Sequence, residues 1–427
     1  MQPSQGDLFA DVADLQVGMY IHLDLSWLEH PFPQSSFKLR TAEQIATVRG
    51  LRLTRVRWSP HLSDIAASSA EAAAADPVAL AEAAAPPVAD PAALAAAQEE
   101  EAAERERRTM RECQKALAEA VRKVKGFSKT LHAQPIETRE QASALVDQLM
   151  QDMLAEAELT IRLMSDPFGG ETAYHHALNV TLLSLMLARA MKAPPAALRA
   201  VGLGALFHDI GKFGIPDRIT RATGPLSRPE MALLQTHPAK GIELAQKMEL
   251  PPEVVQIITQ HHEMVDGSGY PKKLKGSEIS LPARIVAVVN AYDNLCNALN
   301  PQAVMTPHEA LAMLYGRRRG QFDEKVLSTF VRCLGVYPPG SAVRLSDERV
   351  ALVVSVNSTR PLKPMVMVFN PVVAKENAQV LDLEAVPEVS IAKSIRPQDL
   401  PQVTRDYLML GTRTTYYFSA ERAAQRP

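Results

Sequence analysis

One segment of the sequence, residues 63–104, has too few large apolar side chains to contribute to a packed core. It consists mostly of Ala, Glu and Pro. Its alanines favour helix, but Pro77, Pro86, Pro87 and Pro91 interrupt any helix that forms. We therefore predict a linker, disordered apart from transient helix, that divides this chain of 427 residues into separate folding units.

The hydrophobic pattern differs on the two sides of this linker. Residues 1–62 contain VGMYIHLDL and LRLTRVRWS, short runs with β-branched side chains that predict a small mixed α/β domain with a few strands. Residues 105–164 combine high charge with Leu and Met at helical spacing, which predicts a helical connector of one or two amphipathic helices. Its apolar stripe fits either a core face or the seam of a homodimer.

The rest of the chain changes from helical to strand periodicity near residue 335. Residues 165–335 contain a succession of helical runs with Pro, Ser or Thr at their starts, and they predict an all-helical domain. Residues 336–427 contain runs such as VALVVSVN and PMVMVF, which predict a small β-rich region. The expected fold class is multidomain and mainly α.

Charge and cysteine content exclude several functions. The formal net charge of −2 and the pI of about 6.6 provide no basic field for a nucleic-acid backbone, so DNA is not an expected partner. The three cysteines are far apart and show no CxxC spacing, so they suggest neither a disulfide framework nor a thiolate zinc site. Without a secretory signal or an apolar run of about 18 residues, we expect a cytoplasmic protein with no membrane span.

Histidines are concentrated in the predicted helical domain, where six of the 11 in the chain lie between His175 and His262. One of them opens the motif HDIGK, in which an apolar helix delivers His208 and Asp209 at its polar end. Adjacent residues on a helix point in different directions, so this pair can flank two metal ions with the carboxylate between them. Lys212 shares that face and places a cation beside a site suited to phosphate.

The residue types in this cluster indicate metal binding. A His-Asp pair alone is also typical of a buried histidine with a capping aspartate, but further histidines on neighbouring helices favour a metal site. Imidazole and carboxylate without thiolate suit Fe, Mn, Zn, Co or Ni. Two ions about 3.5–4 Å apart generate a bridging hydroxide and hold both oxygens of a phosphoryl displacement. The cluster therefore predicts metal-dependent phosphoesterase chemistry.

The motif HHEMVDGSGYP, residues 261–271, joins two of these histidines to a glycine-rich loop. Gly267 and Gly269 permit positive φ and close backbone approach, and Pro271 stiffens the exit. Alone, DGSGYP is typical of a turn that ends a helix. Directly after HHE, we interpret it as a loop whose Tyr270 and backbone line a pocket beside the metals.

Together these motifs resemble the HD-GYP phosphodiesterases, a bacterial subgroup of the HD superfamily of metal-dependent phosphohydrolases. HDIGK matches the HD motif, HHEMVDGSGYP matches the element that names the subgroup, and VGMYIHLDLSWLEHPFP resembles a domain of unknown function that often precedes it. The resemblance implies two divalent ions, Fe or Mn, and signalling through hydrolysis of cyclic di-GMP to the linear dinucleotide or GMP.

The resemblance also implies roles for individual residues. The metal ligands would be His176, His208, Asp209, His237, His261, His262 and, with an altered side chain, Asn290. Asp209 and Lys212 would act in catalysis, and the residues in contact with the substrate would be Lys212, Gly267, Gly269, Tyr270 and Pro271.

Three departures from the family pattern concern metal and substrate binding. Asn290 stands where the family usually has an aspartate ligand, although Asp293 is retained, and an amide brings no charge to a dication. The segment LCNALNPQAV replaces one with an arginine suited to a phosphate or a guanine edge. Members with three metals carry a glutamate at the position of Thr172, with Glu171 here one residue away, so we predict two metals.

These features are compatible with three functions. The first is an active cyclic di-GMP phosphodiesterase. The second is a catalytically impaired homologue that binds cyclic di-GMP or a signalling protein and acts through conformation. The third is an HD phosphohydrolase for another nucleotide. Metal loading, and its response to Asn290→Asp, separates the first two.

Overall fold

The computed structural model describes residues 8–23, 36–51, 53–63, 91–154, 159–164, 172–357, 360–410 and 413–420. The chain divides into two compact units, Met1–Val88 and Ala89–Pro427. Most of the predicted linker, residues 64–90, and Glu171 lie outside the described residues. The last part of that segment is helical, because helix α2 begins at Pro91.

The first unit is a small mixed α/β domain, as its strand patterns predict. Its antiparallel sheet has the order β1-β4-β2-β3, and the strands are β1 (Leu8–Asp11), β2 (Tyr20–His22), β3 (Ser36–Lys38) and β4 (Arg55–Trp58). Helix α1 (Ala42–Arg49) begins after Thr41, whose side chain accepts a hydrogen bond from the backbone of Gln44. Ile21, Val48 and Val56 are buried in a core that belongs to this unit.

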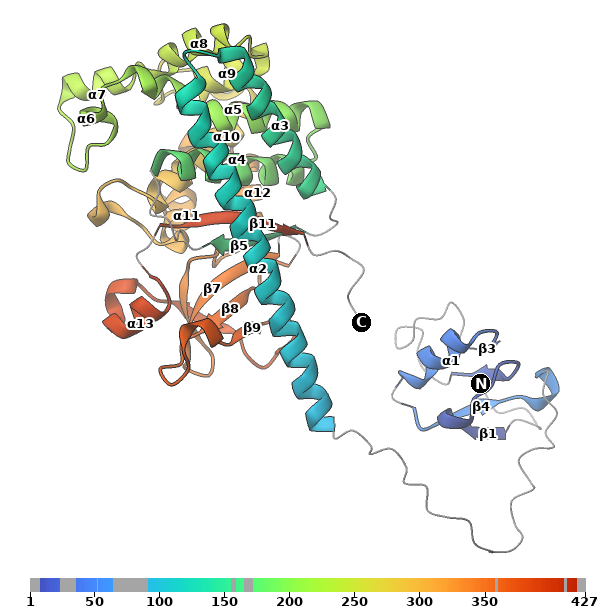
Figure 1. The fold of residues 1–427 in the computed structure, drawn as a ribbon. Coiled ribbons are helices and arrows are strands. Elements are labelled where there is room, and N and C mark those ends of the chain that lie inside the picture. Colours follow the sequence, from blue (N-terminus) through green and yellow to red (C-terminus); the bar gives the residue numbers. More distant parts are fainter. Residues whose placement is uncertain are drawn as a thin grey trace, which may run out of the picture. The chain divides into compact units, whose positions relative to one another are not determined.

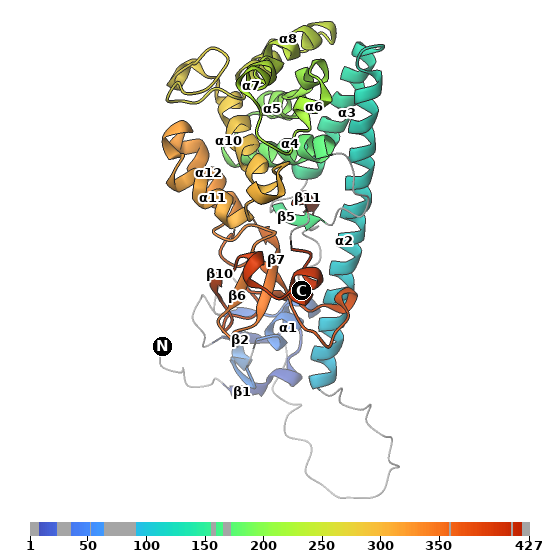
Figure 2. The ribbon, with the colours of Figure 1, turned by 90° about the vertical axis from the view of Figure 1, so that its left-hand side faces the viewer.

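The second unit is mainly helical up to residue 334 (Figures 1 and 2). Its helices are α2 (Pro91–Thr130), α3 (Pro135–Leu154), α4 (Thr172–Ala190), α5 (Pro195–Phe207), α6 (Asp217–Thr220), α7 (Arg228–Leu234), α8 (His237–Lys247), α9 (Pro252–Gln260), α10 (Leu281–Cys296), α11 (Pro307–Gly316) and α12 (Glu324–Leu334). Side chains of Ser227, Ser280, Thr306 and Asp323 cap four of them. The predicted helical fold is therefore confirmed for described residues 172–335.

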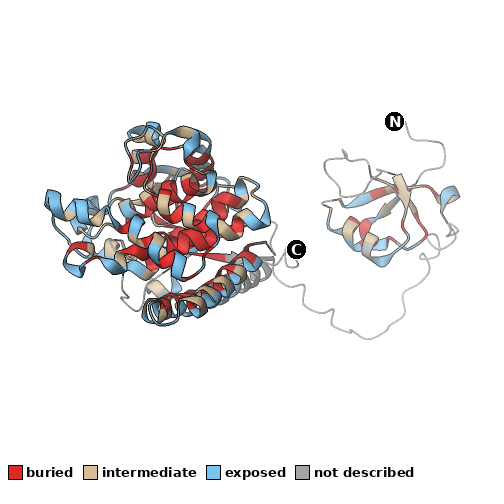
Figure 3. Cartoon of the chain, turned by 90° about the horizontal axis from the view of Figure 1, so that it is seen from above, coloured by how far each residue is buried: buried red, intermediate tan, exposed pale blue. Residues whose placement is uncertain are grey.

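The apolar stripe of α2 forms part of the core. Cys113, Leu117, Val124 and Phe127 are buried against the rest of the unit. Helix α2 runs beside α4 and the strand β11, and Figure 3 shows the buried residues concentrated where the helices meet. Of the two interpretations of this stripe, the core face is the one found. Within the described residues, no helix is both long and apolar enough to cross a bilayer.

An antiparallel sheet of seven strands follows the order β10-β6-β7-β5-β11, with β8 paired to β7 and β9 paired to β8. Its strands are β5 (Leu159–Met164), β6 (Ala342–Leu345), β7 (Val350–Asn357), β8 (Met365–Val368), β9 (Val380–Asp382), β10 (Ile391–Ser394) and β11 (Thr415–Ala420). A short helix, α13 (Gln402–Tyr407), precedes β11. The predicted β-rich C-terminal region is confirmed.

The prediction of a purely helical connector over residues 105–164 is wrong at its end, because LTIRLM forms the strand β5. This strand pairs with β11 on one edge and β7 on the other, and five of its six residues are buried. Burial on both faces removes the polar alternation that would have distinguished it from a helix.

The C-terminal strand shares the core of the helical domain. Tyr416 of β11 is buried, and its hydroxyl lies 2.8 Å from that of Tyr292 on α10. Strand β11 also contacts α4, so the two regions form one packed body. This contact brings C-terminal residues next to the histidine cluster.

Candidate active site

Five histidines and one aspartate converge from four segments of the second unit. His176 lies on α4, His208 and Asp209 follow α5, His237 opens α8, and His261 and His262 follow α9. Their potential ligand atoms form two groups, each within 4.8 Å: His176, His208 and Asp209 in one, and Asp209, His237, His261 and His262 in the other. The two groups share Asp209.

The carboxylate of Asp209 lies between the two groups. Its Oδ2 is 3.3 Å from His208 Nε2 and 3.6 Å from His176 Nε2. Its Oδ1 is 3.3 Å from His237 Nε2 and 3.7 Å from His261 Nε2. Each oxygen therefore faces a different set of imidazoles, which is the geometry of a carboxylate that bridges two cations.

The ring nitrogens that face the centre of the cluster carry lone pairs. In four rings, Nδ1 lies beside an acceptor oxygen: 2.6 Å from Asp293 Oδ2 for His176, 2.7 Å from the Ala205 carbonyl for His208, and 2.8 Å from the Leu234 and Ile258 carbonyls for His237 and His261. Nδ1 is therefore the nitrogen that donates, and in the neutral form of each ring Nε2 carries the lone pair.

These free nitrogens approach one another in pairs. The Nε2 atoms of His176 and His208 are 3.1 Å apart, and so are those of His237 and His261. Facing lone pairs repel unless a cation lies near both of them. Asp209 Oδ1 is also buried and has no hydrogen-bond donor among the described residues. The donor set and this orphaned oxygen both fit metal ions.

Burial keeps the cluster in the protonation state that metals require. It lowers the pKa of His261 to about 3, and it also lowers the pKa values of His208 and His262, so these rings are neutral at pH 7. Burial alone would raise the pKa of Asp209. The ammonium charge of Lys212, whose Nζ is 2.5 Å from Oδ2, outweighs burial and holds this pKa well below its usual value.

A close backbone contact brings two of the segments together. After α5 the chain continues as the short 3-10 helix η4 (Ile210–Gly214), which packs on α8. A Cβ at Gly211 would lie 1.9 Å from the carbonyl oxygen of His237. Only glycine allows this approach, and it places Asp209 beside His237.

Glu263, the third residue of the HHE motif, anchors the loop that follows. Its side chain is buried, and its carboxylate accepts hydrogen bonds from the backbone N–H groups of Lys272 (2.6 Å) and Leu274 (2.9 Å). Charge-assisted bonds of this kind are about twice as strong as neutral ones. Glu263 therefore holds the GYP loop against the histidine pair.

The GYP loop packs on His262. The Tyr270 ring stacks on this histidine, with ring centroids 4.5 Å apart, and a Cβ at Gly269 would lie 2.5 Å from its carbonyl oxygen. Gly267 has a φ of +82°, which favours glycine. Beside the histidine cluster lies a cavity, and the described residues that line it do not include Gly267, Gly269, Tyr270 or Pro271. Their contact with substrate stays a prediction.

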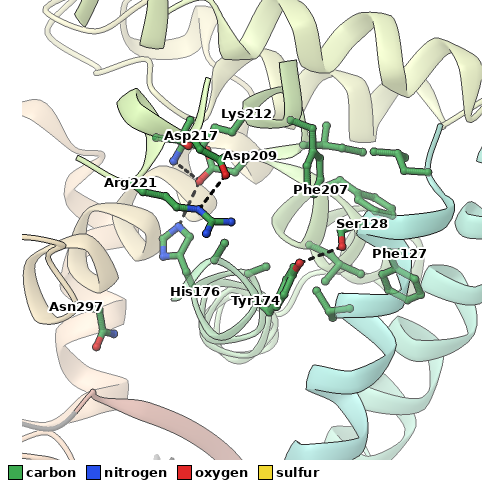
Figure 4. Close-up of a pocket in the computed structure, with 18 of the residues that line it drawn as sticks. Phe127, Ser128, Tyr174, His176, Phe207, Asp209, Lys212, Asp217, Arg221 and Asn297 are labelled. Atoms are coloured by element: carbon green, nitrogen blue, oxygen red, sulfur yellow. Dashed lines mark hydrogen bonds and ion pairs between the residues drawn. The ribbon is translucent and has the colours of Figure 1, made fainter. Parts of the chain in front are cut away.

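A cavity of about 350 Å³ opens beside the cluster (Figure 4). His176, Asp209 and Lys212 form a polar part of its wall. Apolar side chains, including Phe127 of α2 and Phe207 of α5, form another part. Such a cavity suits a ligand that has an anionic group and a flat apolar part.

Two protein families match this chain: an HD domain over residues 145–326, and a domain of unknown function, DUF3391, over residues 10–161. The cyclic di-GMP phosphodiesterase PA4108 of Pseudomonas aeruginosa is 32% identical over 364 residues, which cover 84% of each chain. This chain belongs to the HD-GYP phosphodiesterase family. The HD-domain family is metal-dependent, in keeping with the histidine cluster.

Other relatives match shorter parts of this chain. The cyclic di-GMP phosphodiesterase response regulator RpfG of Xanthomonas campestris is 37% identical over 139 residues, which are 32% of this chain and 36% of the relative. The 3'3'-cGAMP-specific phosphodiesterase 1 of Vibrio cholerae is 31% identical over 160 residues, which are 37% of both chains.

Asn290, the altered position of this HD-GYP protein, lies next to the cluster. It is buried on α10 and lines a second, smaller cavity together with His261 and His262. Its side-chain oxygen accepts a hydrogen bond from Asn294 Nδ2 at 2.7 Å. The Asn290 amide is therefore close to the ligand group that contains His261 and His262, but its oxygen is already hydrogen-bonded to Asn294.

Two residues that support the site were not among the predicted ligands or substrate contacts. Asp293 accepts hydrogen bonds from His176 (2.6 Å), Asn179 (2.7 Å) and Asn297 (3.0 Å). The sequence did carry a signal for Asp293, because it lies three residues after Asn290 and therefore on the same side of α10. Arg413, which lines the cavity, follows a β-rich region without any motif, so the sequence carried no signal for it.

Proposed function

We propose that this protein is a phosphodiesterase that hydrolyses cyclic di-GMP to the linear dinucleotide or GMP with two divalent ions, Fe or Mn. The observation that carries this proposal is the shared position of Asp209 between two groups of imidazoles. The relatives named cyclic di-GMP phosphodiesterases support the substrate.

The proposed ligands fall into the two groups already described. His176 and His208 would hold one ion, and His237, His261 and His262 the other, with Asp209 between them. When bound, two such ions lower the pKa of a water so that it can attack a phosphodiester, and they neutralise charge on the phosphate.

The protein's own groups prepare the site for this reaction. Asp293 fixes the ring of His176 so that Nε2 points to the cluster. Lys212 lies at the cavity wall beside Asp209, where its ammonium group would stabilise negative charge on the phosphate. The apolar part of the wall would receive a guanine base.

A second function, a receptor for cyclic di-GMP without hydrolysis, is favoured by Asn290. An amide brings no charge to a cation, and its oxygen is bonded to Asn294. If this position must ligate, metal affinity will be low in the natural protein. The variant Asn290→Asp would then increase both metal content and hydrolysis.

The test starts with anaerobic purification and metal analysis of the full chain. The protein is then incubated with cyclic di-GMP or 3'3'-cGAMP, and the products are separated by chromatography. We expect two metals per chain and conversion of cyclic di-GMP. A loaded protein that cleaves only 3'3'-cGAMP would refute the substrate. An empty protein that Asn290→Asp loads and activates would support the receptor function.

A further inference from the structure

Three cationic side chains line the cavity beside the cluster: Lys212, Arg221 and Arg413. Lys212 is bonded to Asp209 at the centre. Arg221 follows α6, and its Nε lies 3.5 Å from the carboxylate of Asp217. Arg413 comes from the C-terminal region, outside the residues matched to the HD domain. A region without catalytic motifs therefore contributes a charge to the cavity wall.

The backbone next to Arg413 is anchored to two helices of the site. The N–H of Thr414 donates to Asn297 Oδ1 at 2.9 Å, and the Thr414 carbonyl accepts from Asn297 Nδ2 (2.9 Å) and Asn179 Nδ2 (2.8 Å). Arg413 Nη1 itself lies 3.4 Å from His175 Nδ1 on α4. Because the backbone is fixed in this way, only the side chain of Arg413 has to be ordered when it binds a ligand.

The neighbouring wall has no positive charge of its own. Asn294, Asn297 and Leu299 line this side of the cavity, and residues 294–306 contain neither Lys nor Arg. Arg413 adjoins this neutral wall through the bonds between Thr414 and Asn297. It thus provides positive charge beside α10.

We propose that Arg413 binds the second phosphate of the cyclic dinucleotide, the one that is not being cleaved; this inference rests on the proposed function. A cyclic dinucleotide has two phosphodiesters, and the metal cluster takes one. A guanidinium can bind the other with two parallel hydrogen bonds. Arg221 is less suited, because the carboxylate of Asp217 beside it repels phosphate and both side chains are mostly exposed.

The experiment compares substrates with and without a second phosphate. Full-length protein loaded with manganese is assayed with cyclic di-GMP and with bis(p-nitrophenyl) phosphate, which has a single phosphodiester. For Arg413→Ala and Arg413→Gln, the ratio of kcat/KM for the dinucleotide to kcat/KM for the small diester should fall about 10- to 100-fold, mainly through KM. Arg396→Ala, at an exposed arginine of the same region that does not line the cavity, is the matched control.

The outcomes separate this inference from the proposed function. An unchanged ratio in both Arg413 variants, or equal losses on both substrates, would overturn the role of Arg413. If the natural protein cleaves the small diester but not cyclic di-GMP, the proposed function fails. Calorimetric titration with cyclic di-GMP then decides: weaker binding to Arg413→Gln supports the inference, and no binding to the natural protein overturns it.

Discussion

Asp293 offers the sharpest test of how the site is held together. One of its oxygens accepts a hydrogen bond from His176 Nδ1 at 2.6 Å, and the other accepts hydrogen bonds from the amides of Asn179 and Asn297. All three neighbours are donors, so this position needs an acceptor at both oxygens. The variant Asp293→Asn has nearly the same shape but replaces one oxygen with an NH2 group.

Either orientation of the new amide creates a conflict. If its NH2 faces Asn179 and Asn297, donors meet donors in a buried site, which costs about 1–3 kcal/mol of folding stability. If its NH2 faces His176, the ring must carry its proton on Nε2 and loses the lone pair that binds metal. Mutation of the hydrogen-bond partner of a metal-binding histidine typically lowers metal affinity about 10- to 100-fold, and we expect a decrease of this size in Asp293→Asn.

The assay is a calorimetric titration of metal-free protein with manganese, followed by urea unfolding of the same samples. Asp347→Asn, on the exposed turn between β6 and β7, serves as the control for loss of a carboxylate. Natural manganese affinity together with a natural free energy of unfolding in Asp293→Asn would refute the reasoning.

Two further predictions concern stability. Burial lowers the pKa of His261 from 6.5 to about 3, so the unfolded chain binds more protons between these values. Metal-free protein should therefore lose about 1 kcal/mol of unfolding free energy per pH unit from about pH 6 to pH 4, and a constant urea midpoint would contradict this. In Gly269→Ala, the new Cβ would lie 2.4 Å from Met264 N, so thermal unfolding should show a loss of about 2 kcal/mol or more. Gly316→Ala is the control and should show no such loss, because a Cβ at this position would have no neighbouring atom within 4 Å.

The parts of the site that lie close together in the sequence could be predicted from it. HDIGK places Asp209 next to His208, and HHEMVDGSGYP joins a histidine pair to a glycine loop, so spacing on one helix or turn already limits their geometry. The helical fold of residues 172–335 was equally predictable, because apolar spacing and capping residues are local features.

Contacts between distant segments could not be predicted in this way. LTIRLM is a strand because β7 and β11 pair with its two edges, and no local pattern specifies those partners. The bond between Asn297 and Thr414 joins residues 117 positions apart, and it places Arg413 at the cavity. The sequence by itself determined which chemical groups are available. The tertiary structure decided which of them meet, because burial and strand pairing bring segments together regardless of their separation along the chain.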